Sequence, residues 1–501
     1  MSQQIEERIR FAPLRERVLA PEEAAELVKD GMRIGTAGTP SGVACPISFF
    51  EALVKRAEKG EKFKIDLWSA APMSPDIDGK LAELGVVNRR LDHQSNPVLA
   101  RAANAGQVHY SDMGSTWLAH QVRSRTIGRP DLVVLEAIEI NDEGFIVPSL
   151  LVSDLPTLAQ YAEMIIVEIN LNLPLELSGI HDIYVLDSPP QRKPIPLSSV
   201  ADRIGTPYIQ LDPQKIKGII ISDKKSRLPE RPAIDEVSRQ IGRNVVSFFE
   251  QEVEKGRLPQ SLLPLQTGLG ALGGAILSEL AQSSFKDLEV SSSLLDDAVL
   301  DLIDSGKIKF VSGCGCFFSE EAMRRLTRDM KRYKERIILR PLDVINSPEV
   351  IGRLGVIALN SAIEMDIYGH INSSHLAGTR IVAGPSGSLE YSRNGYISIF
   401  MAPSIARAGD ISTIVPMVSH VDHTEHEVSV IVTEQGVADL RGLDPKERAV
   451  EIIGKCAHPD YKPLLWDYFR EANAKGGHEP HVLSKAFDFH FRLAERGMMK
   501  I

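Results

Sequence analysis

The chain has 501 residues, a length that corresponds to roughly two to four domains. Its composition, 43% hydrophobic and 25% charged residues, is typical of a globular protein and excludes an intrinsically disordered chain. The net charge of −10 provides no basic footprint for nucleic acid, so we expect a soluble metabolic protein with no nucleic-acid partner.

The four cysteines, Cys45, Cys314, Cys316 and Cys456, are too few for a disulfide framework. The spacing in "GCGC" (313–316) does not fit a zinc pair, so we expect both of its cysteines to be small buried hydrophobic residues. The N-terminal sequence has no signal-peptide apolar stretch, and no apolar run approaches the roughly 18–20 residues that span a bilayer. We therefore expect a cytoplasmic protein with no membrane partner.

Helical and strand-like segments alternate from the N-terminus onward. The segment "PEEAAELVKDG" (21–31) predicts a helix with Pro21 in its first turn and Gly31 at its end. The short apolar runs "KFKIDLWSA", "LVVLEAIEI" and "AEMIIVEIN" predict strands, and helical segments separate them. This alternation is typical of βαβ units and predicts an α/β fold with mainly parallel sheets.

The residue composition of the sequence changes near residue 225. A charged, proline-bearing stretch, "SDKKSRLPERPAIDE", predicts a linker, and a helical segment, "EVSRQIGRNVVSFFEQEVEKG", follows it. Alternating strands and helices then resume. We therefore expect an N-terminal α/β domain over residues 1–225 and a C-terminal α/β domain over residues 226–501.

A short internal similarity indicates that the two halves are related. Both "IEINDEGFI" (138–146) and "IEMDIYGHI" (363–371) predict a strand, a turn with glycine and a second strand. The glycines, Gly144 and Gly369, occupy the same position in the two segments. One short match is weak evidence of duplication, and chance remains an alternative.

Two glycine-rich loops could hold an anionic ligand. The first, "LQTGLGALGGAILSEL" (265–280), opens a helix, and free N–H groups at a helix start bind anions and oxyanions. The second, "AGTRIVAGPSGSLEYSRNG" (377–395), could present bare backbone N–H groups. For both loops a tight turn without a ligand is an equally good interpretation.

The densest polar stretch runs from residue 409 to 442. His420, His423 and His426 repeat every third residue, which suggests a metal site. The segment has the character of a turn between strands, however, and this spacing would not place three imidazoles on one face. We therefore favour a hydrogen-bonded polar loop and no metal.

Glu434 follows the apolar strand "VSVIV" directly. In open α/β sheets ligands bind beside the carboxyl ends of strands, so a carboxylate at this position is a candidate site residue. Capping of a following helix is an alternative of similar weight.

Several of these stretches resemble one family. The segment "SIARAGDISTIVPMVSHVDHTEHEVSVIVTEQGVADLRGLDPKERA" is similar to the C-terminal signature of the acetyl-CoA hydrolase/transferase family, which includes succinyl-CoA:acetate CoA-transferases. "EINDEGFIVPS", "LSGIHDIYVLDSPPQRKPIPL", "GRLPQSLLPLQTGLG" and "CAHPDYKPLLWDYF" also resemble family motifs. The resemblance runs from about residue 30 to 470.

The resemblance implies two related open α/β CoA-transferase domains with the active site between them. It also implies a ping-pong reaction in which a glutamate attacks an acyl-CoA, forms an acyl–glutamyl anhydride and then carries CoA as a thioester. Coenzyme A enters as acyl-CoA, a small carboxylate is the possible acceptor, and no metal or redox cofactor is needed. A homodimer is expected, with a hetero-oligomer containing a homologous subunit as the alternative.

The resemblance assigns candidate residues to this reaction. The catalytic candidates are Ser293, at the position of the family glutamate, together with Glu434 and the oxyanion-binding Gly387. The candidates for holding CoA are Gln266, Gly268, Gly270, Ala271, Ala383, Gly384, Gly387, Arg407 and the arginine of the Ser226–Arg227 pair.

The sequence departs from the family pattern at the nucleophile. The family segment reads Tyr-Thr-Glu-Val-Ile-Gln-Asp-Gly, and "FKDLEVSSSLLDDAVLDLI" (285–303) has Ser293 in place of the glutamate. Asparagines of the two glycine loops are also missing, at Ala271, Gly274 and Ala383. A serine ester would lie well below a thioester in energy, so return of CoA would stall.

Four explanations remain open. The chain could bind acyl-CoA and carry out different chemistry, such as hydrolysis, decarboxylation or carbon–carbon bond cleavage, which is our leading hypothesis. It could be a classical CoA-transferase with another nucleophile, of which Glu289 is a weak candidate, or a non-catalytic CoA-binding subunit. An engineered Glu→Ser change is disfavoured because the glycine loops differ as well.

Overall fold

The structure is a computed structural model, and it describes residues 3–39, 42–225 and 228–501. The chain divides into two compact units. Unit 1 comprises Met1–Arg231, Val290–Asp297 and Phe310–Arg353; unit 2 comprises Pro232–Glu289, Ala298–Lys309 and Leu354–Ile501. Residues 290–297, which include Ser293, and residues 310–353 thus belong to unit 1, although they come from the second half of the chain. The predicted division after residue 225 falls beside residues 226–227, which lie outside the described residues, and it stays a prediction.

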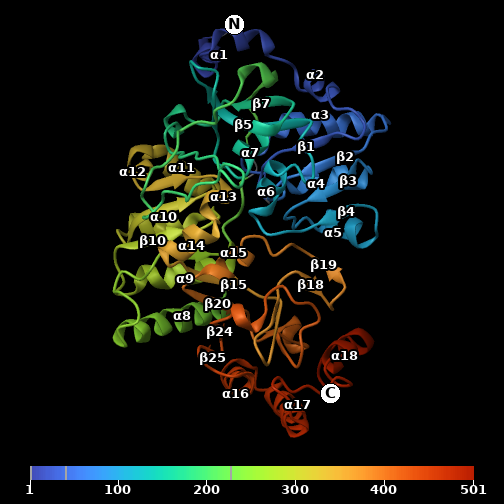
Figure 1. Ribbon diagram of the computed structural model, residues 1–501, viewed down its shortest axis with the longest axis vertical. Helices are drawn as coiled ribbons and strands as arrows, with labels where there is room; N and C mark the ends of the chain where they lie inside the picture. Colours follow the sequence, from blue (N-terminus) through green and yellow to red (C-terminus); the bar gives the residue numbers. More distant parts are fainter. Residues whose placement is uncertain (1–2, 40–41, 226–227) are drawn as a thin grey trace. The chain divides into compact units, whose positions relative to one another are not determined.

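Unit 1 is built on a mainly parallel sheet with the strand order β4-β3-β2-β1-β5-β7-β8, and β6 pairs antiparallel with β5. Its strands are β1 (Arg33–Gly35), β2 (Ile65–Trp68), β3 (Val87–Leu91), β4 (His109–Ser111), β5 (Leu132–Ile140), β6 (Ile146–Pro148), β7 (Met164–Asn170) and β8 (Ile216–Ser222). Every residue of β5 is buried, as expected for a central strand covered on both faces. Figure 1 shows β5 and β7 side by side with α7 next to them.

Helices cover this sheet. They are α1 (Gln3–Arg8), α2 (Pro21–Glu26), α3 (Ile47–Glu58), α4 (Pro75–Glu83), α5 (Pro97–Asn104), α6 (Trp117–Arg123) and α7 (Leu155–Tyr161). Helices α2 to α5 pack around one hydrophobic core, to which Phe49, Phe50 and Leu53 of α3 contribute. Because the apolar residues of α3 recur at helical spacing, one face of the helix is buried.

The later segments of unit 1 are shorter elements around the Ser293 loop. They include β11 (Leu294–Leu295), β13 (Gly315–Cys316), β14 (Ile337–Leu339), α11 (Glu320–Arg328), α12 (Met330–Lys334) and α13 (Leu342–Ile345). Four elements cross a boundary between the units: β10 (Leu288–Ser291), α10 (Asp297–Asp304), of which only Asp297 belongs to unit 1, β12 (Ile308–Gly313) and α14 (Pro348–Leu354). Strands β11 and β13 pair in parallel, as do β12 and β14.

Unit 2 contains the consecutive strands β9-β15-β20-β24-β25, of which the first four are parallel. Strand β25 pairs antiparallel with β24. The strands are β9 (Leu265–Thr267), β15 (Ile357–Ser361), β20 (Ile397–Met401), β24 (Val430–Thr433) and β25 (Gly436–Asp439). The helices are α8 (Glu236–Glu254), α9 (Ala271–Gln282), α10 (Asp297–Asp304), α15 (Ser388–Asn394), α16 (Pro445–Cys456), α17 (Lys462–Lys475) and α18 (Asp488–Arg496).

Short strands beside the unit 2 sheet carry most of its polar loops. They are β16 (Glu364–Asp366), β17 (Ile371–Asn372), β18 (His375–Leu376), β19 (Arg380–Ile381), β21 (Ile405–Ala406), β22 (Ile411–Ser412) and β23 (Ile414–Val415). The two similar segments, 138–146 and 363–371, both form antiparallel hairpins, β5–β6 in unit 1 and β16–β17 in unit 2. Gly144 and Gly369 adopt φ values of +82° and +98° in their turns, which explains why both positions are glycine.

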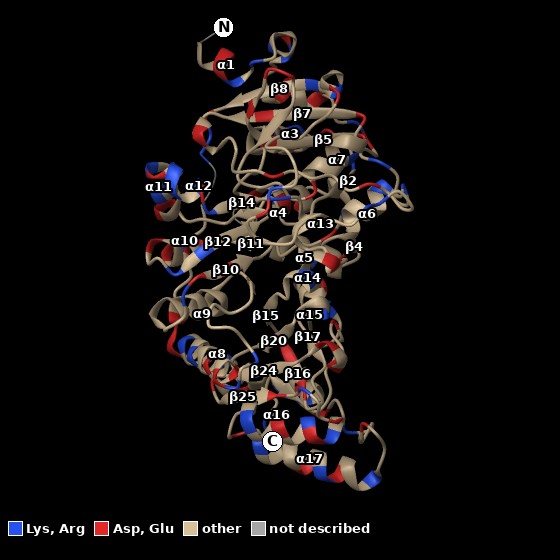
Figure 2. Ribbon diagram, turned by 60° about the vertical axis from the view of Figure 1, so that its left-hand side comes forward, with Lys and Arg blue, Asp and Glu red and all other residues tan. Residues whose placement is uncertain are grey.

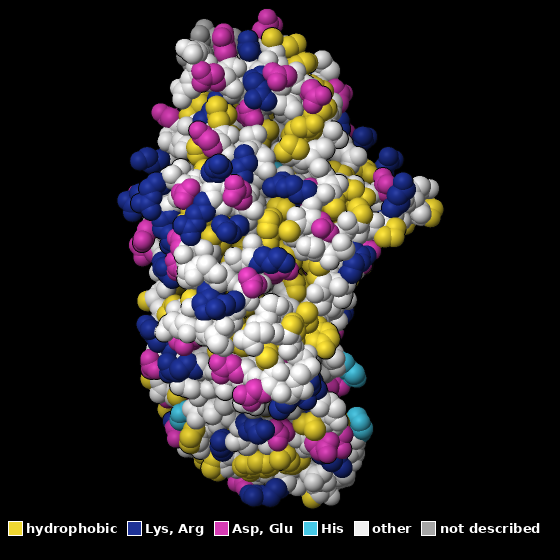
Figure 3. All heavy atoms as spheres, turned by 90° about the vertical axis from the view of Figure 1, so that its left-hand side faces the viewer, with side chains coloured by type: hydrophobic (Ala, Val, Ile, Leu, Met, Phe, Trp, Pro, Cys, Tyr) yellow, Lys and Arg dark blue, Asp and Glu magenta, His cyan; other side chains and the backbone are white. Residues whose placement is uncertain are grey.

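Charged residues are distributed over the helices of both units. Figure 2 shows Lys or Arg next to Asp or Glu along α16 and α17. Figure 3 shows Lys and Arg gathered on one face where α11 and α12 contribute Arg324, Arg325, Arg328, Lys331, Arg332 and Lys334. Among the described residues, no helix is both long and apolar enough to cross a bilayer. The strand pairings in the two units confirm the predicted α/β architecture with mainly parallel sheets.

Candidate active site

Ser293 lies in unit 1, in the short segment between β10 and β11. Its carbonyl oxygen accepts a hydrogen bond from Cys314 N at 2.8 Å, which fixes the backbone. Its Oγ donates to Asn346 Oδ1 at 2.9 Å. The side chain is partly exposed, so a ligand can reach it.

The partner of Ser293 is an amide and not a base. Asn346 is fully buried at the end of α13, and its Nδ2 donates to Ser115 Oγ at 2.6 Å. Because Nδ2 is committed to Ser115, Oδ1 is the atom that faces Ser293. An amide oxygen accepts a hydrogen bond but does not remove the proton, so this contact orients the Ser293 hydroxyl without activating it.

Two thiols and a carboxylate in the segments around Ser293 are further potential nucleophiles, and the structure gives the thiols and the carboxylate different roles. Burial raises the pKa of the Cys314 and Cys316 thiols well above the ordinary value, so both stay protonated and inert. All four cysteines are free and buried, and the prediction that Cys314 and Cys316 are buried is confirmed. Asp297 accepts hydrogen bonds from Ser319 N, at 2.8 Å, and from Ser319 Oγ, so it connects the start of α10 to that of α11.

In unit 2 the first glycine loop joins β9 directly to α9. Gly270 caps the helix with φ +114°, a value that favours glycine. A Cβ on Gly273 would lie 2.1 Å from the carbonyl oxygen of Gly268, so this position has no room for a side chain. The first turn of α9, which begins at Ala271, leaves N–H groups without intrahelical partners.

Gln266 lies on β9, but hydrogen bonds within the sheet use its amide group. Oε1 accepts from Leu359 N at 3.2 Å, and Nε2 donates to Asn360 Oδ1 at 3.2 Å. Since Leu359 and Asn360 belong to the neighbouring strand β15, Gln266 links the two strands below the glycine loop. Its expected contact with CoA stays a prediction.

Topology brings the predicted residues of unit 2 to one edge of the sheet. The glycine loop that begins with Gly268 follows β9, and Glu434 follows β24, so both are at the carboxyl ends of parallel strands. Helix α15 leads back into β20, which brings its start, at Gly387, to the same edge. In the strand order β9-β15-β20-β24, the strands that precede the glycine loop and Glu434 are three positions apart. Three strand spacings separate β9 from β24 by roughly 14 Å.

Glu434 is held at this edge by a neighbouring strand connection. Ser404, which follows β20, donates to the Glu434 carboxylate from its backbone N at 2.8 Å and from its Oγ, and Gln435 Nε2 donates at 3.0 Å. Burial pushes the pKa of Glu434 upward, but these hydrogen bonds outweigh burial and lower the pKa below its usual value. Glu434 is therefore an ionised carboxylate at neutral pH.

The second glycine loop precedes α15. Ala383 and Gly384 follow the β18–β19 hairpin, and Ser386 adopts a left-handed backbone with φ +51°. Gly387 is buried, and among the described residues none accepts a hydrogen bond from its N–H. A buried N–H without a protein acceptor is the kind of group that can bind an oxyanion.

The remaining two basic candidates differ in how well they are described. Arg407 lies in an exposed turn with φ +49° between β21 and β22. The exposure of its side chain is compatible with a phosphate contact. The arginine of the 226–227 pair lies outside the described residues, so its expected contact with CoA stays a prediction.

The three histidines of the polar stretch point to three different environments. His423 is fully buried, with its ring nitrogens next to Ser388 Oγ at 3.1 Å and Ser392 Oγ at 2.9 Å. The side chain of His426 is 80% exposed, and His420 contacts Asp422. The prediction that they do not share one face is confirmed.

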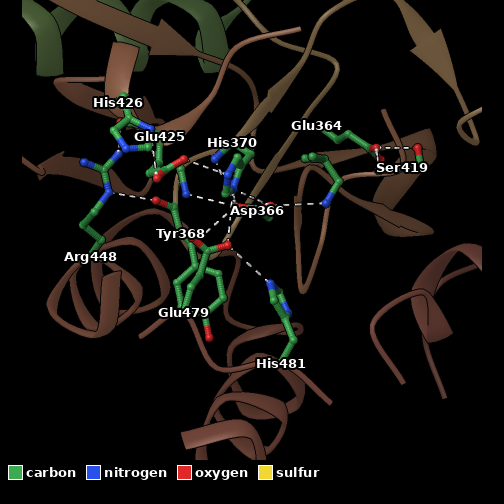
Figure 4. Close-up of polar contacts among 12 residues, drawn as sticks. Glu364, Asp366, Tyr368, His370, Ser419, Glu425, His426, Arg448, Glu479 and His481 are labelled. Atoms are coloured by element: carbon green, nitrogen blue, oxygen red, sulfur yellow. Dashed lines mark hydrogen bonds and ion pairs between the residues drawn. The ribbon is translucent and has the colours of Figure 1, made fainter. Parts of the chain in front are cut away.

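A cluster of acidic side chains surrounds His370 in unit 2 (Figure 4). Its Nδ1 lies 3.2 Å from Asp366 and 3.9 Å from Glu479, and its Nε2 lies 2.8 Å from Glu425. Burial alone would lower the pKa of His370, but the hydrogen bond to Asp366 and the charges of the three carboxylates outweigh burial and raise the pKa to about 9. His370 is therefore an imidazolium that connects β16 to the segments at Glu425 and Glu479.

We expect this imidazolium to stabilise the fold in a pH-dependent way. Because the pKa rises from 6.5 to about 9 on folding, the contribution, on the order of 3 kcal/mol, is fully present below pH 6.5. It is lost as the pH rises through about 9. His370→Gln should therefore lower the urea midpoint of unfolding at pH 6, with a much smaller difference from the unaltered protein near pH 10.

His426→Gln is the matched control for this prediction. His426 also contacts Glu425, at 3.0 Å, but its side chain is 80% exposed, so its replacement should change the urea midpoint little at either pH. A deficit of His370→Gln that is equally large at both pH values would contradict the assignment.

Comparisons with known proteins show the family to which the chain belongs. The acetyl-CoA hydrolase/transferase N-terminal domain matches residues 2–221, and the C-terminal domain of the same family matches residues 323–469. The succinyl-CoA:acetate CoA-transferase of Clostridium kluyveri is 42% identical over 99% of this chain and 92% of its own length. The chain belongs to the acetyl-CoA hydrolase/transferase family. It therefore belongs to a family of enzymes that act on CoA thioesters.

Other relatives within the acetyl-CoA hydrolase/transferase family include hydrolases by name. The acetyl-CoA hydrolase of Schizosaccharomyces pombe is 40% identical over 99% of this chain and 98% of its own length. Among solved structures, RipA from Yersinia pestis has a TM-score of 0.70 at 20% identity, covering 92% of this chain and 99% of that one. The 4-hydroxybutyrate CoA-transferase from Porphyromonas gingivalis has a TM-score of 0.63 at 23% identity, with coverage of 92% and 99%. These likenesses confirm the fold.

Three residues of the candidate site were not predicted from the sequence. Asn346 and Ser115 continue the hydrogen bonds of Ser293, and Ser404 holds Glu434. Asn346 is 53 positions from Ser293, and Ser404 is 30 positions from Glu434. No local pattern signals such contacts, because they depend on which strands become neighbours in the sheet.

Proposed function

We propose that this chain acts on an acyl-CoA thioester by hydrolysis and does not form the glutamyl-CoA intermediate of the family's transferases. The observation that carries the proposal is the hydrogen bond from Ser293 Oγ to Asn346 Oδ1. The position that the family resemblance assigns to the nucleophilic glutamate has a short hydroxyl, and its partner is an amide that cannot take its proton. Ser293 is therefore a poor nucleophile and a suitable hydrogen-bonding partner for water.

The groups of unit 2 support a direct attack by water. The ionised Glu434 carboxylate accepts a proton from water while the water oxygen bonds to the thioester carbonyl carbon. The electron pair of the carbonyl moves to its oxygen, which the Gly387 N–H stabilises. Collapse of this intermediate breaks the C–S bond, and the departing CoA thiolate receives the proton from Glu434. The products are a carboxylic acid and CoA.

The first glycine loop and Arg407 are proposed to hold the CoA portion. The free N–H groups at the start of α9 and the exposed guanidinium of Arg407 suit phosphate groups. Ala271 and Gly274 are smaller than the asparagines that the family pattern has at these positions. A Cβ added at Gly274 would make an ordinary contact with Ile234, at 3.8 Å, so our proposal of a larger acyl group than acetyl rests only on the loss of the two asparagine side chains.

Carboxylate CoA-transfer is the alternative function, and the 42% identity to a protein named succinyl-CoA:acetate CoA-transferase favours it. In that case another residue would carry CoA. Glu289 is a weak candidate, because its carboxylate forms an ion pair with Lys309 at 3.3 Å. A homodimer and a small carboxylate acceptor also remain proposals.

Replacing Ser293 by alanine tests the proposed role. Loss of a true serine nucleophile costs up to about 10⁶-fold in turnover, whereas we expect Ser293→Ala to retain turnover within about tenfold. The measurement is release of free CoA thiol from a panel of acyl-CoA substrates of increasing size. Glu289→Gln is the matched control and should behave like the unaltered protein. A collapse of turnover in Ser293→Ala alone would make Ser293 the nucleophile and overturn the proposal.

A further inference from the structure

Two histidines and one aspartate of unit 2 converge outside the proposed catalytic groups. One donor atom from each of His375, His420 and Asp422 lies within 4.8 Å of the other two. His375 begins β18, whereas His420 and Asp422 lie in the loop between β23 and β24. The two imidazole rings are 3.8 Å apart between centroids with an interplanar angle of 35°.

Serine side chains orient this group. Ser374 Oγ lies 2.7 Å from His375 Nδ1 and donates to both oxygens of Asp422 at 2.8 Å. Because Ser374 Oγ donates its only proton to Asp422, it accepts from Nδ1–H of His375. Ser373 N donates to Asp422 at 2.7 Å. Metal-binding imidazoles are held in the same way, through a hydrogen bond from the ring nitrogen that does not bind the metal.

We propose that His375, His420 and Asp422 bind one divalent transition-metal ion, with Zn²⁺ as the best match. Two imidazoles and a carboxylate are a common zinc ligand set, and a water completes four-coordination. Bonds of about 2.0–2.1 Å place tetrahedral ligand atoms roughly 3.3 Å apart, so donors up to 4.8 Å apart need to draw together by at most about 1.5 Å. His420 Nε2 and Asp422 Oδ1, at 3.2 Å, already have this spacing. The side chain of His420 is 36% exposed, which provides both the freedom to adjust and a path for the ion.

The ion would connect the β18–β19 hairpin to the loop at His420. Since β19 ends two residues before Ala383, the same hairpin leads directly into the second glycine loop. His423, in the same polar loop as His420, contacts Ser388 at the start of α15. A metal at this position would therefore stabilise the arrangement of the glycine loop from outside, with no part in the proposed chemistry.

The cluster at His370 is a less suitable metal site. Both ring nitrogens of His370 face carboxylates, Nδ1 toward Asp366 and Nε2 toward Glu425. The imidazolium itself satisfies these carboxylates, and Asp366 also accepts backbone N–H groups from Tyr368 and Gly369. A cation there would have to displace the His370 imidazolium from two carboxylates, whereas at His420 it would displace the contact of Nε2 with Asp422 Oδ1 at 3.2 Å.

Metal titration of the full-length protein after removal of ions with a chelator tests the proposal. We expect one equivalent of Zn²⁺ to bind by calorimetry, and bound Co²⁺ to give the visible absorption bands of a tetrahedral site. His420→Ala should weaken binding by more than about 100-fold, and Ser374→Ala, which removes only the orienting group, by about 10–100-fold. His426→Ala is the matched control and should bind like the unaltered protein.

Each outcome of this titration either supports or overturns the proposed metal site. Stoichiometric binding that His420→Ala abolishes and His426→Ala preserves would support the site. Absence of Zn²⁺ binding, binding that His420→Ala leaves unchanged, or equal losses in both variants would overturn it. Far-ultraviolet circular dichroism of each variant separates loss of a ligand from loss of the fold.

Discussion

Glu434→Gln is expected to lower the turnover of acyl-CoA by about 10²–10⁴-fold, the usual contribution of a positioned acid–base group. Glutamine preserves the shape of the side chain and can still accept a hydrogen bond from Ser404 N. It removes the negative charge, however, so it can no longer take a proton from water. Initial rates of CoA release, measured at saturating and at low substrate, give kcat and kcat/KM.

Because the proposed role lies in the chemical step, kcat should fall more than KM changes. Gln435→Ala is the matched control, since Gln435 Nε2 donates to the same carboxylate from the neighbouring position but holds no charge. We expect its turnover to fall much less. Unchanged kcat in Glu434→Gln would remove Glu434 from the reaction.

The largest expected effect on stability comes from a buried ion pair in unit 1. Arg340 and Asp182 are fully buried, and Arg340 also donates to Ser312 Oγ at 2.8 Å. Burial lowers the pKa of Arg340 to about 10, so the side chain remains charged at neutral pH. Arg340→Met should destabilise the protein by about 3–5 kcal/mol, because it leaves the Asp182 carboxylate buried without its cation.

The urea midpoint of unfolding measures this loss. The double variant Asp182→Asn with Arg340→Met should recover part of it, since no buried charge remains. Arg324→Met is the matched control, because Arg324 and Glu320 form an exposed pair at 3.9 Å and its removal should cost less than about 1 kcal/mol. Equal losses in Arg340→Met and Arg324→Met would contradict the account of the buried pair.

Local periodicity was enough to predict much of the fold. The run "LVVLEAIEI" predicted a strand and is the buried strand β5, and the segment after the linker predicted the helix α8. The glycines of the two hairpins were also predictable, because a tight turn with positive φ excludes most other residues. Such features depend only on residues that are close in the sequence.

Which segments of the chain form each of the two units was not predictable in the same way. Ser293 lies in the second half of the chain, yet its segment packs with unit 1, where Asn346 contacts it. Long-range strand pairing decides this assignment, and a linear division of the sequence cannot express it.

The candidate site was predictable to the extent that topology places loops. The carboxyl-end rule placed Glu434 just after a strand, and Glu434 follows β24 at the edge of the unit 2 sheet where the first glycine loop also lies. The rule says nothing about Ser404, which holds Glu434, or about His375, which meets His420 from another hairpin. Side-chain partners of this kind follow from tertiary packing and need the structure.

The most direct test of the central proposal is mass spectrometry of the full-length protein with succinyl-CoA and an excess of acetate. We predict that no acetyl-CoA forms and that the protein acquires no covalent CoA, because no glutamate is present at the position of Ser293. Any substrate of suitable size should instead yield free CoA and its acid. Formation of acetyl-CoA, with CoA attached to a residue of the chain, would contradict the account and establish carboxylate CoA-transfer.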